Sequence, residues 1–320
     1  MTERAAAARV VLPSVSVVVP VYNSMDSLPE LVRRLGEVLP RCAREYELIL
    51  VNDGSRDESA AVIAALTREH AWVRGLELMR NYGQHNAILA GIRAARNEVT
   101  VTIDDDLQNP PEETPKLLAK LDEGHDVVYG TPAREQHGLL RNLASRLTKL
   151  ALQQAMGTSI ARQVSAFRAF RTELREAFAG YSSPHVFIDV LLTWGAARFA
   201  AVVVRHDVRP YGTSNYTLPR LLFHALNMLT GFSTLPLQLA SLLGFVFTLV
   251  GFALLAYVLA VYVANSGAVP GFTFLAAVLT LFSGVQLFAL GVIGEYIARI
   301  HHRTMERPPY VLRGPRDGVE

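Results

Sequence analysis

The sequence predicts an α/β fold: a mostly parallel sheet covered by helices, followed by two membrane-spanning helices near the C-terminus. Two observations indicate this architecture. Strand and helix patterns alternate from residue 15 to residue 129, and no Asp, Glu, Lys or Arg occurs from Leu221 through Gly294. Parallel strands need helical crossovers, which the first pattern supplies, and a long uncharged stretch is typical of membrane proteins.

The alternating part contains five expected strands and four expected helices. The strands are short apolar runs at residues 15–20, 46–52, 73–79, 98–104 and 126–129. The helices follow the 3.6-residue period of apolar side chains at residues 27–39, 57–69, 84–95 and 112–121. A strand–helix–strand order of this kind favours right-handed crossovers between parallel strands.

Polar clusters follow three of the expected strands at their carboxyl ends. They are Tyr22 with Asn23, residues 52–55 and residues 104–106. Ligands of open α/β sheets bind beyond the carboxyl ends of the strands, so we expect these clusters to converge on one site. A GxGxxG fingerprint and a P-loop are both absent from the sequence, which argues against dinucleotide redox chemistry and Walker-type phosphate binding.

The carboxylates after the fourth strand predict a metal site. Asp104 and Asp106 would raise one another's pKa unless a cation lay between them, and Asp105 should point the other way. Mg²⁺ and Mn²⁺ favour oxygen ligands, so the two carboxylates and the amide oxygen of Gln108 form a candidate site. An acidic turn that caps the next helix is the alternative; it explains the glutamates at 112–113 but not the aspartates.

Two segments predict membrane-spanning helices. Residues 235–263 and 272–294 each exceed the roughly 20 apolar residues that a helix needs to cross a bilayer. The connector between them lacks Lys and Arg, whereas the tail of residues 295–320 is rich in arginine. The positive-inside rule then places both termini in the cytoplasm. A buried helical hairpin in a soluble protein is the alternative.

Two further helices are expected close to the membrane. On a helix over residues 138–156, leucines gather on one face, and Arg141, Arg146 and Lys149 occupy the other. A basic amphipathic helix in a two-span protein is typical of a membrane-surface helix, although it could also pack on the sheet. Residues 217–234 predict a juxtamembrane helix that leads into the first span.

Composition limits the remaining possibilities. The net charge of +2 is too small to indicate a nucleic-acid partner, although the pI of about 8.7 leaves room for basic patches. Cys42 is the only cysteine, so an intrachain disulfide and a cysteine-rich metal site are excluded. The first residues lack the apolar core of a signal peptide, so we expect the N-terminal half to stay in the cytoplasm.

Several motifs carry a family resemblance. They are Val-Pro-Val-Tyr-Asn at 19–23, Val-Asn-Asp-Gly-Ser at 51–55, Arg-Asn-Tyr-Gly-Gln-His-Asn-Ala at 80–87, Asp-Asp-Asp-Leu-Gln-Asn-Pro-Pro-Glu at 104–112, Arg-Pro-Tyr-Gly-Thr-Ser-Asn-Tyr at 209–216 and Gly-Glu-Tyr-Ile-Ala-Arg at 294–299. The chain resembles the inverting nucleotide-sugar glycosyltransferases of the GT-A fold. Within them it resembles the bacterial polyprenyl-phosphate branch, which includes undecaprenyl-phosphate glucosyl and formamido-arabinose transferases.

The resemblance implies a role for each matching position in a cytoplasmic catalytic domain of residues 10–216. Nucleotide-binding residues would be Pro20, Tyr22, Asn23, Asp53, Gly54 and Asp104. Asp104, Asp106 and Gln108 would hold the diphosphate through Mg²⁺ or Mn²⁺, and Asp104, Asp106 and Arg168 would be catalytic. The phosphate of the acceptor would meet Arg141, Arg146, Lys149, Arg209, Ser214 and Tyr216.

One departure from the family pattern concerns the catalytic base. Many relatives hold an aspartate shortly before the Phe-Arg pair at 167–168, whereas residues 160–166 of this chain contain no carboxylate. No base is therefore assigned. The reaction can proceed without one, because a lipid phosphate with a second pKa of about 6 is already largely ionised at neutral pH.

The function expected from these observations is transfer of a sugar from a nucleotide-diphosphate sugar to polyprenyl phosphate, with a UDP-sugar as the expected donor. The reaction would invert the sugar at the cytoplasmic leaflet of the plasma membrane and supply envelope glycan modification, and relatives imply a homotetramer. The alternative is a non-catalytic scaffold or accessory subunit of a lipid-linked sugar translocation system. A processive polysaccharide synthase is disfavoured, because the Gln-x-x-Arg-Trp motif is absent.

Overall fold

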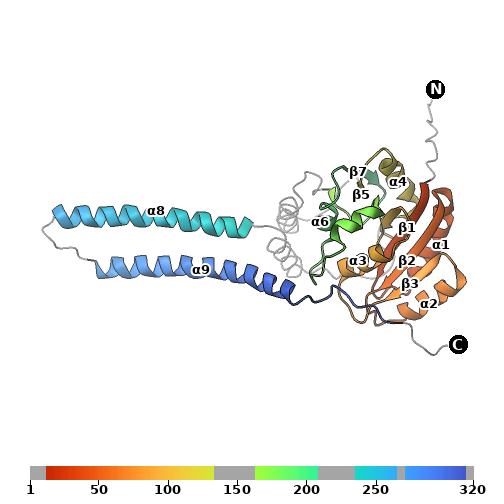
Figure 1. The fold of residues 1–320 in the computed structure, drawn as a ribbon, viewed down its shortest axis with the longest axis horizontal. Coiled ribbons are helices and arrows are strands. Elements are labelled where there is room, and N and C mark those ends of the chain that lie inside the picture. The colour runs from red at the N-terminus through yellow and green to blue at the C-terminus, as the bar shows by residue number, and fades with distance from the viewer. Residues whose placement is uncertain (1–11, 133–162, 208–234, 265–270, 315–320) are drawn as a thin grey trace, which may run out of the picture.

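The computed structural model describes residues 12–132, 163–207, 235–264 and 271–314 (Figure 1). The strands are β1 (Leu12–Val21), β2 (Ala43–Asn52), β3 (Val73–Glu77), β4 (Val99–Thr102), β5 (Val127–Pro132), β6 (Arg168–Arg171) and β7 (Phe199–Val204). The helices are α1 (Leu28–Val38), α2 (Ser59–Glu69), α3 (Gln84–Ala94), α4 (Thr114–Asp122), α6 (Ile188–Leu192), α8 (Leu235–Ala264) and α9 (Phe272–Thr304). Short 3₁₀ turns occupy Leu39–Arg41, Pro111–Glu113 and Thr172–Phe178.

The seven strands form one sheet in the order β3-β2-β1-β4-β6-β5-β7. β1 pairs in parallel with β2 and β4, β2 with β3, and β5 with β7. β6 lies between β4 and β5 and is antiparallel to both, the only strand of this sheet that is antiparallel to its neighbours. The expected α/β class with a mostly parallel sheet is therefore confirmed, and the antiparallel strand is an addition that the sequence pattern did not predict.

Helices cover both faces of the sheet, which explains why its strands are almost continuously apolar. On one face, α1, α2 and α4 pack on alternate strand residues such as Val17, Leu50 and Val101. On the other face, α3, α6 and the turn Thr172–Phe178 pack on the intervening residues, such as Val18 and Phe170. In the described part of the chain, the first face therefore carries one apolar core and the second face carries two.

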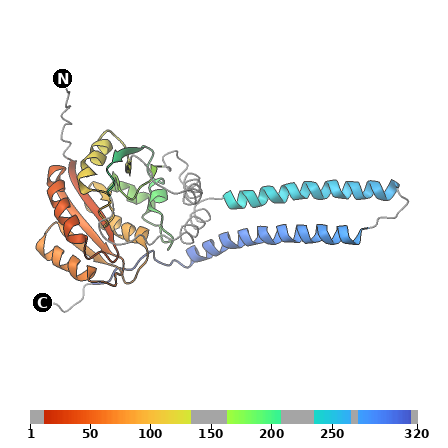
Figure 2. The same cartoon turned by 180° about the vertical axis from the view of Figure 1, so that it is seen from behind.

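The C-terminal helices α8 and α9 lie side by side and project away from the sheet domain (Figure 1, Figure 2). Pro236–Val258 and Leu281–His301 are long and apolar enough to cross a membrane, with mean hydropathies of 2.4 and 1.5. Only 6% and 0% of these stretches is buried inside the protein, which contradicts the alternative of a buried hairpin in a soluble protein. The second helix extends past the expected end at 294, to Thr304.

The chain returns to the sheet after α9. Leu312 forms an antiparallel bridge with Leu78, the Met79 amide donates to the Val311 carbonyl at 2.9 Å, and Tyr310 packs between two of the apolar cores. These contacts attach the end of α9 to the loop that follows β3. The return of the tail was not predicted.

Candidate active site

The carboxyl ends of β1, β2 and β4 lie next to one another because these strands are parallel neighbours. The loops that follow them are joined by hydrogen bonds. The Tyr22 amide donates to the Asp105 carboxylate at 3.4 Å, and the Asn23 amide donates to the Ser55 hydroxyl at 3.0 Å. The structure therefore brings the three polar clusters together at one edge of the sheet, as expected.

The loop after β1 is shaped by Asn23, whose φ of 54° lies in the left-handed region that Asn tolerates. Its side-chain oxygen accepts a hydrogen bond from the Arg56 amide at 2.8 Å and so fastens this loop to the next one. Pro20 is buried inside β1, whereas Tyr22 is 39% exposed. Tyr22 and Asn23 are therefore the exposed members of the expected nucleotide-binding set in this loop.

Asp53 organises the loop between β3 and α3. Its side chain is buried, and its two oxygens accept hydrogen bonds from the backbone amides of Tyr82 at 2.7 Å and Gly83 at 2.8 Å. Burial raises the pKa of Asp53 above its ordinary value, against the opposing effect of these two bonds. Its expected contact with a nucleotide base stays a prediction, and in this structure both oxygens serve the protein's own backbone.

Gly54 permits the same loop to come close. Its φ is +65°, and a Cβ at this position would lie 2.6 Å from backbone atoms of Arg80 and Asn81. Any other residue would therefore combine a strained backbone with a collision against main chain that cannot move aside. The glycine places the segment of residues 80–83 directly against the carboxyl end of β2.

The carboxylate cluster follows β4. Burial, together with the charges of Asp106 and Asp105, raises the pKa of Asp104 to about 7, while Arg168 and a hydrogen bond from Gln84 oppose the rise. That bond joins Gln84 Nε2 to Asp104 Oδ1 at 2.7 Å. Burial also raises the pKa of Asp105 to about 6. Asp105 turns toward the β1 loop, as its place in the motif predicts.

The backbone turns sharply between the two other candidate ligands. Leu107 has a φ of 59° although it is not glycine, and its side chain is buried. Such a conformation is strained and persists because the surrounding packing fixes it. The turn brings the backbone amide nitrogen of Gln108 to 3.0 Å from Asp106 Oδ1, to which it donates a hydrogen bond.

These residues fit a divalent cation by their chemistry. Among the residues that the structure describes, no three His, Cys, Asp or Glu side chains are gathered as a metal site. Two carboxylates and an amide oxygen suit Mg²⁺ or Mn²⁺ nonetheless, because such ions keep positions open for water and phosphate oxygens. The raised pKa of Asp104 points the same way, since a cation would relieve the repulsion that causes part of it.

Arg168 lies beneath this cluster rather than in the open crevice. Its side chain is 1% exposed, it donates from Nε to the Thr102 hydroxyl at 2.9 Å, and it forms an ion pair with Asp189 of α6. Asp189 is also close to the Tyr129 hydroxyl and contributes, after burial, to a raised pKa of that phenol. A direct contact between Arg168 and phosphate stays a prediction; the structure shows it supporting the end of β4.

The remaining predicted site residues lie outside the described part of the chain. They are Arg141, Arg146, Lys149, Arg209, Ser214 and Tyr216, together with the expected helices at 138–156 and 217–234. The structure also adds residues that sequence reasoning did not assign. Gln84 had a signal, because it belongs to the motif at 80–87, whereas Asp189 has no motif and is recognised only by its contact with Arg168.

Comparison with known proteins places the chain among related sequences. Residues 16–178 match the family described as Glycosyl transferase family 2. An undecaprenyl-phosphate 4-deoxy-4-formamido-L-arabinose transferase of Klebsiella pneumoniae is 39% identical over 93% of this chain and 92% of that protein. A transferase of the same name from Pseudomonas aeruginosa is 40% identical over 93% of this chain and 89% of that protein.

Among solved structures, glucosyl-3-phosphoglycerate synthase from Mycobacterium tuberculosis, in complex with phosphoglyceric acid, has a similar fold. The TM-score is 0.51 at 21% sequence identity, over 68% of this chain and 79% of that chain. A likeness at this identity concerns the fold, and it agrees with the sheet described above.

Proposed function

The chain belongs to glycosyl transferase family 2, and on this premise we propose that it transfers a sugar from a nucleotide diphosphate sugar to undecaprenyl phosphate with inversion. A UDP-sugar is the proposed donor, and 4-deoxy-4-formamido-L-arabinose, which the relatives' names specify, is the first sugar to test. The observation that carries the proposal is the loop of Asp104, Asp106 and Gln108 at the carboxyl edge of the sheet. This loop places negative charge at the edge where open α/β sheets bind their ligands.

The donor would be held at this edge by the chain's own polar groups. Asp104, Asp106 and Gln108 would bind Mg²⁺ or Mn²⁺, which when present neutralises the charge of a diphosphate leaving group. Tyr22 and the segment fastened by Asp53 would line the nucleotide. Arg168 would keep the end of β4 in position from below through its bond to Thr102.

The acceptor would approach from the membrane side. Its phosphate is already largely ionised at neutral pH, so it can attack the anomeric carbon without first losing a proton to a base. Two anions must meet in this step, which makes positioning and cationic side chains the main requirements. Arg141, Arg146, Lys149 and Arg209, with Ser214 and Tyr216, are the proposed contacts of the lipid phosphate.

Membrane attachment is part of the same proposal. The apolar helices α8 and α9 would anchor the enzyme in the plasma membrane as a two-span protein with both termini in the cytoplasm. The sheet domain would then face the cytoplasmic leaflet, where nucleotide sugars are present. A homotetramer is the proposed assembly, as the family resemblance implies, and small residues on α9 would allow close helix contacts within it.

The rival function is a non-catalytic scaffold of a lipid-linked sugar translocation system. It predicts binding of nucleotide without turnover. The intact Asp104, Asp106 and Gln108 argue against it, since a scaffold has no need of a loop that can bind a metal ion.

A transfer assay tests the proposal. Radiolabelled UDP-, GDP- and dTDP-sugars would be incubated with undecaprenyl phosphate and the full-length protein in detergent, with Mg²⁺ or Mn²⁺ and with chelator. One donor should give an organic-extractable product that chelator abolishes. Absence of lipid product from every donor, in a folded protein that still binds nucleotide, would favour the scaffold.

A further inference from the structure

Three consecutive residues after β7 bond to the loop that follows Asp106. The Asp207 amide donates to the Gln108 carbonyl at 2.8 Å, and the Arg205 amide donates to the Glu113 carboxylate at 3.2 Å. Between them, the His206 ring lies 3.4 Å from the Asn109 side-chain oxygen. The two segments therefore run antiparallel to one another and are joined at both ends and in the middle.

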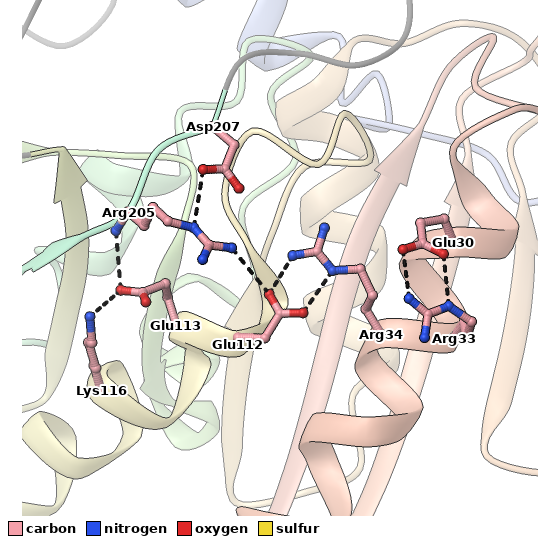
Figure 3. A network of polar contacts seen from close by, with 8 residues as sticks. All are labelled: Glu30, Arg33, Arg34, Glu112, Glu113, Lys116, Arg205 and Asp207. Carbon is pink, nitrogen blue, oxygen red and sulfur yellow. Dashed lines mark hydrogen bonds and ion pairs between the residues drawn. The ribbon is translucent and has the colours of Figure 1, made fainter.

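The far side of the loop is held by α1. Arg34 forms a two-pronged ion pair with Glu112, in which Nε lies 2.8 Å from Oε1 and a second nitrogen contacts Oε2. The guanidinium of Arg205 lies 3.9 Å from the same carboxylate, and its Nε lies 3.1 Å from Asp207 Oδ1 (Figure 3). Glu112 is thus shared between an arginine of α1 and an arginine of the segment after β7.

This arrangement differs from an ordinary surface ion pair. The side chain of Arg34 is 16% exposed and reaches across to a distant part of the chain. The neighbouring Arg33 is 56% exposed and pairs within its own helix with Glu30 and Glu37. Exposed pairs of the second kind contribute little, whereas a bidentate arginine in a network fixes geometry.

The loop so held begins at a proposed metal ligand. Gln108 contributes its carbonyl to the contact with Asp207, so the same residue faces the segment after β7 and follows Asp106 by two positions. Pro110 and Pro111 are buried and restrict the backbone beyond it. A shift of this loop would therefore move the ligand side chains themselves.

We propose that Arg34, Glu112 and residues 205–207 form a clasp that positions Asp106 and Gln108 for the metal-bound diphosphate of the donor. These are positioning residues, because they act through the loop and not by contact with the substrate. The inference rests on the proposed function for its consequence, donor binding, but the clasp itself concerns only the protein.

The first test measures the clasp without any ligand. Full-length wild-type, Arg34→Ala and Arg33→Ala proteins would be compared in detergent by amide hydrogen exchange. The backbone amides of Gln108, Glu113 and Asp207, which donate hydrogen bonds in this structure, should exchange about tenfold faster in Arg34→Ala, whereas Arg33→Ala should match the wild type. Equal protection of this loop in all three proteins would overturn the clasp, whatever the activity of the enzyme.

The second test measures its consequence with MnCl₂ and UDP as probes. Substitution of residues that orient metal ligands typically lowers metal affinity by about 10-fold to 100-fold. Arg34→Ala and Glu112→Gln should therefore weaken Mn²⁺–UDP binding by about tenfold. Arg34→Lys should fall between them and the wild type, because lysine cannot form the two-pronged pair. The KM for undecaprenyl phosphate should change by less than about twofold.

The two tests distinguish failure of the clasp from failure of the proposed function. Equal loss of donor and acceptor affinity, or equal effects of Arg33→Ala and Arg34→Ala, would overturn the positioning role. If wild-type protein bound neither Mn²⁺ nor UDP, the proposed function would fail, while the exchange experiment would still decide whether the clasp exists.

Discussion

The two ends of the sheet treat buried charge in opposite ways. In the amino-terminal half, the Glu47 carboxylate accepts hydrogen bonds from the Ser16 hydroxyl, the Arg74 guanidinium and the Arg96 amide. Burial alone would raise the pKa of Glu47, but these bonds outweigh it and lower the pKa. At the carboxyl end, burial and neighbouring carboxylates raise the pKa of Asp104 to about 7. Carboxylate charge is compensated at one end and only partly compensated at the other.

The backbone conformation differs as well, although Gly124, in the turn before β5, also has a positive φ. The loops after β1, β2, β3 and β4 each contain one residue with a positive φ, namely Asn23, Gly54, Gly83 and Leu107. The conformation is strained only at Asn23 and Leu107, because glycine adopts a positive φ freely, and strained backbone gathers at functional sites. We therefore expect substitutions at the amino end to change stability and substitutions at the carboxyl end to change ligand binding.

The largest effect is expected from the carboxylate loop. Asp106→Asn keeps the size of the side chain but removes a charge that a divalent cation needs, so transfer should fall at least about 100-fold. Thermal stability should stay near that of the wild type, because the substitution also relieves repulsion of Asp104. Steady-state transfer rates and a melting curve of the same preparation check both expectations.

At the amino end, Glu47→Gln should change stability and leave catalysis intact. The variant leaves Arg74 without its anionic partner and weakens a buried network, which should lower the free energy of unfolding by about 1–3 kcal/mol. Denaturant titration gives this value. A fall in kcat for the folded fraction, comparable with that of Asp106→Asn, would break the contrast between the ends.

Acid should also separate the two ends. Because the pKa of Asp104 is raised to about 7, metal binding must displace its proton at lower pH, and Mn²⁺ affinity should weaken by up to about tenfold per unit below pH 7. The pKa of Glu47 is lowered, so its contribution to stability is present above pH 4.5 and disappears as the pH falls through its folded value. Mn²⁺ titrations and melting curves across this range would show loss of metal first and loss of fold later. Coincident losses would contradict this order.

The smallest effect is expected from the returning tail. The Tyr310 ring packs between two apolar cores, and its centroid lies 5.8 Å from the guanidinium carbon of Arg93. The adjacent Val311 carbonyl holds Met79 at the start of the loop that Asp53 fastens. Tyr310→Ala should therefore raise the donor KM by about twofold to fivefold through a loosened loop. Val311→Ala is the matched control, since the Val311 side chain is 43% exposed and its contact is made by the backbone. Equal donor KM values for the two variants would show that the tail does not affect donor binding.

Much of the fold, and the place of the candidate site in it, could be predicted from the sequence. The alternation of apolar runs located the parallel strands, and the polar residues after β1, β2 and β4 located the edge of the candidate site, because both features depend on local pattern. The two apolar helices were located by the absence of charge. The antiparallel strand β6 was not predicted, since four residues reading Arg-Ala-Phe-Arg carry no directional signal.

Contacts between distant residues were beyond reach for a different reason. Nothing local in the sequence indicates that Arg168 is buried against Asp189, that both oxygens of Asp53 face backbone amides, or that Arg205 and Arg34 share one glutamate. Each of these depends on tertiary packing between segments far apart in the chain. Sequence motifs therefore located the candidate site, and the structure was needed to show which of its residues hold the others in place.

The most direct test of the account is a single assay of three proteins: wild type, Asp106→Asn and Glu47→Gln. Each would be supplied with radiolabelled UDP-4-deoxy-4-formamido-L-arabinose, undecaprenyl phosphate and Mn²⁺, with and without chelator. The account predicts chelator-sensitive lipid product from wild type and from the folded fraction of Glu47→Gln, and almost none from Asp106→Asn. Product that survives both chelation and Asp106→Asn would contradict the assignment of the carboxylate loop as the donor's metal site.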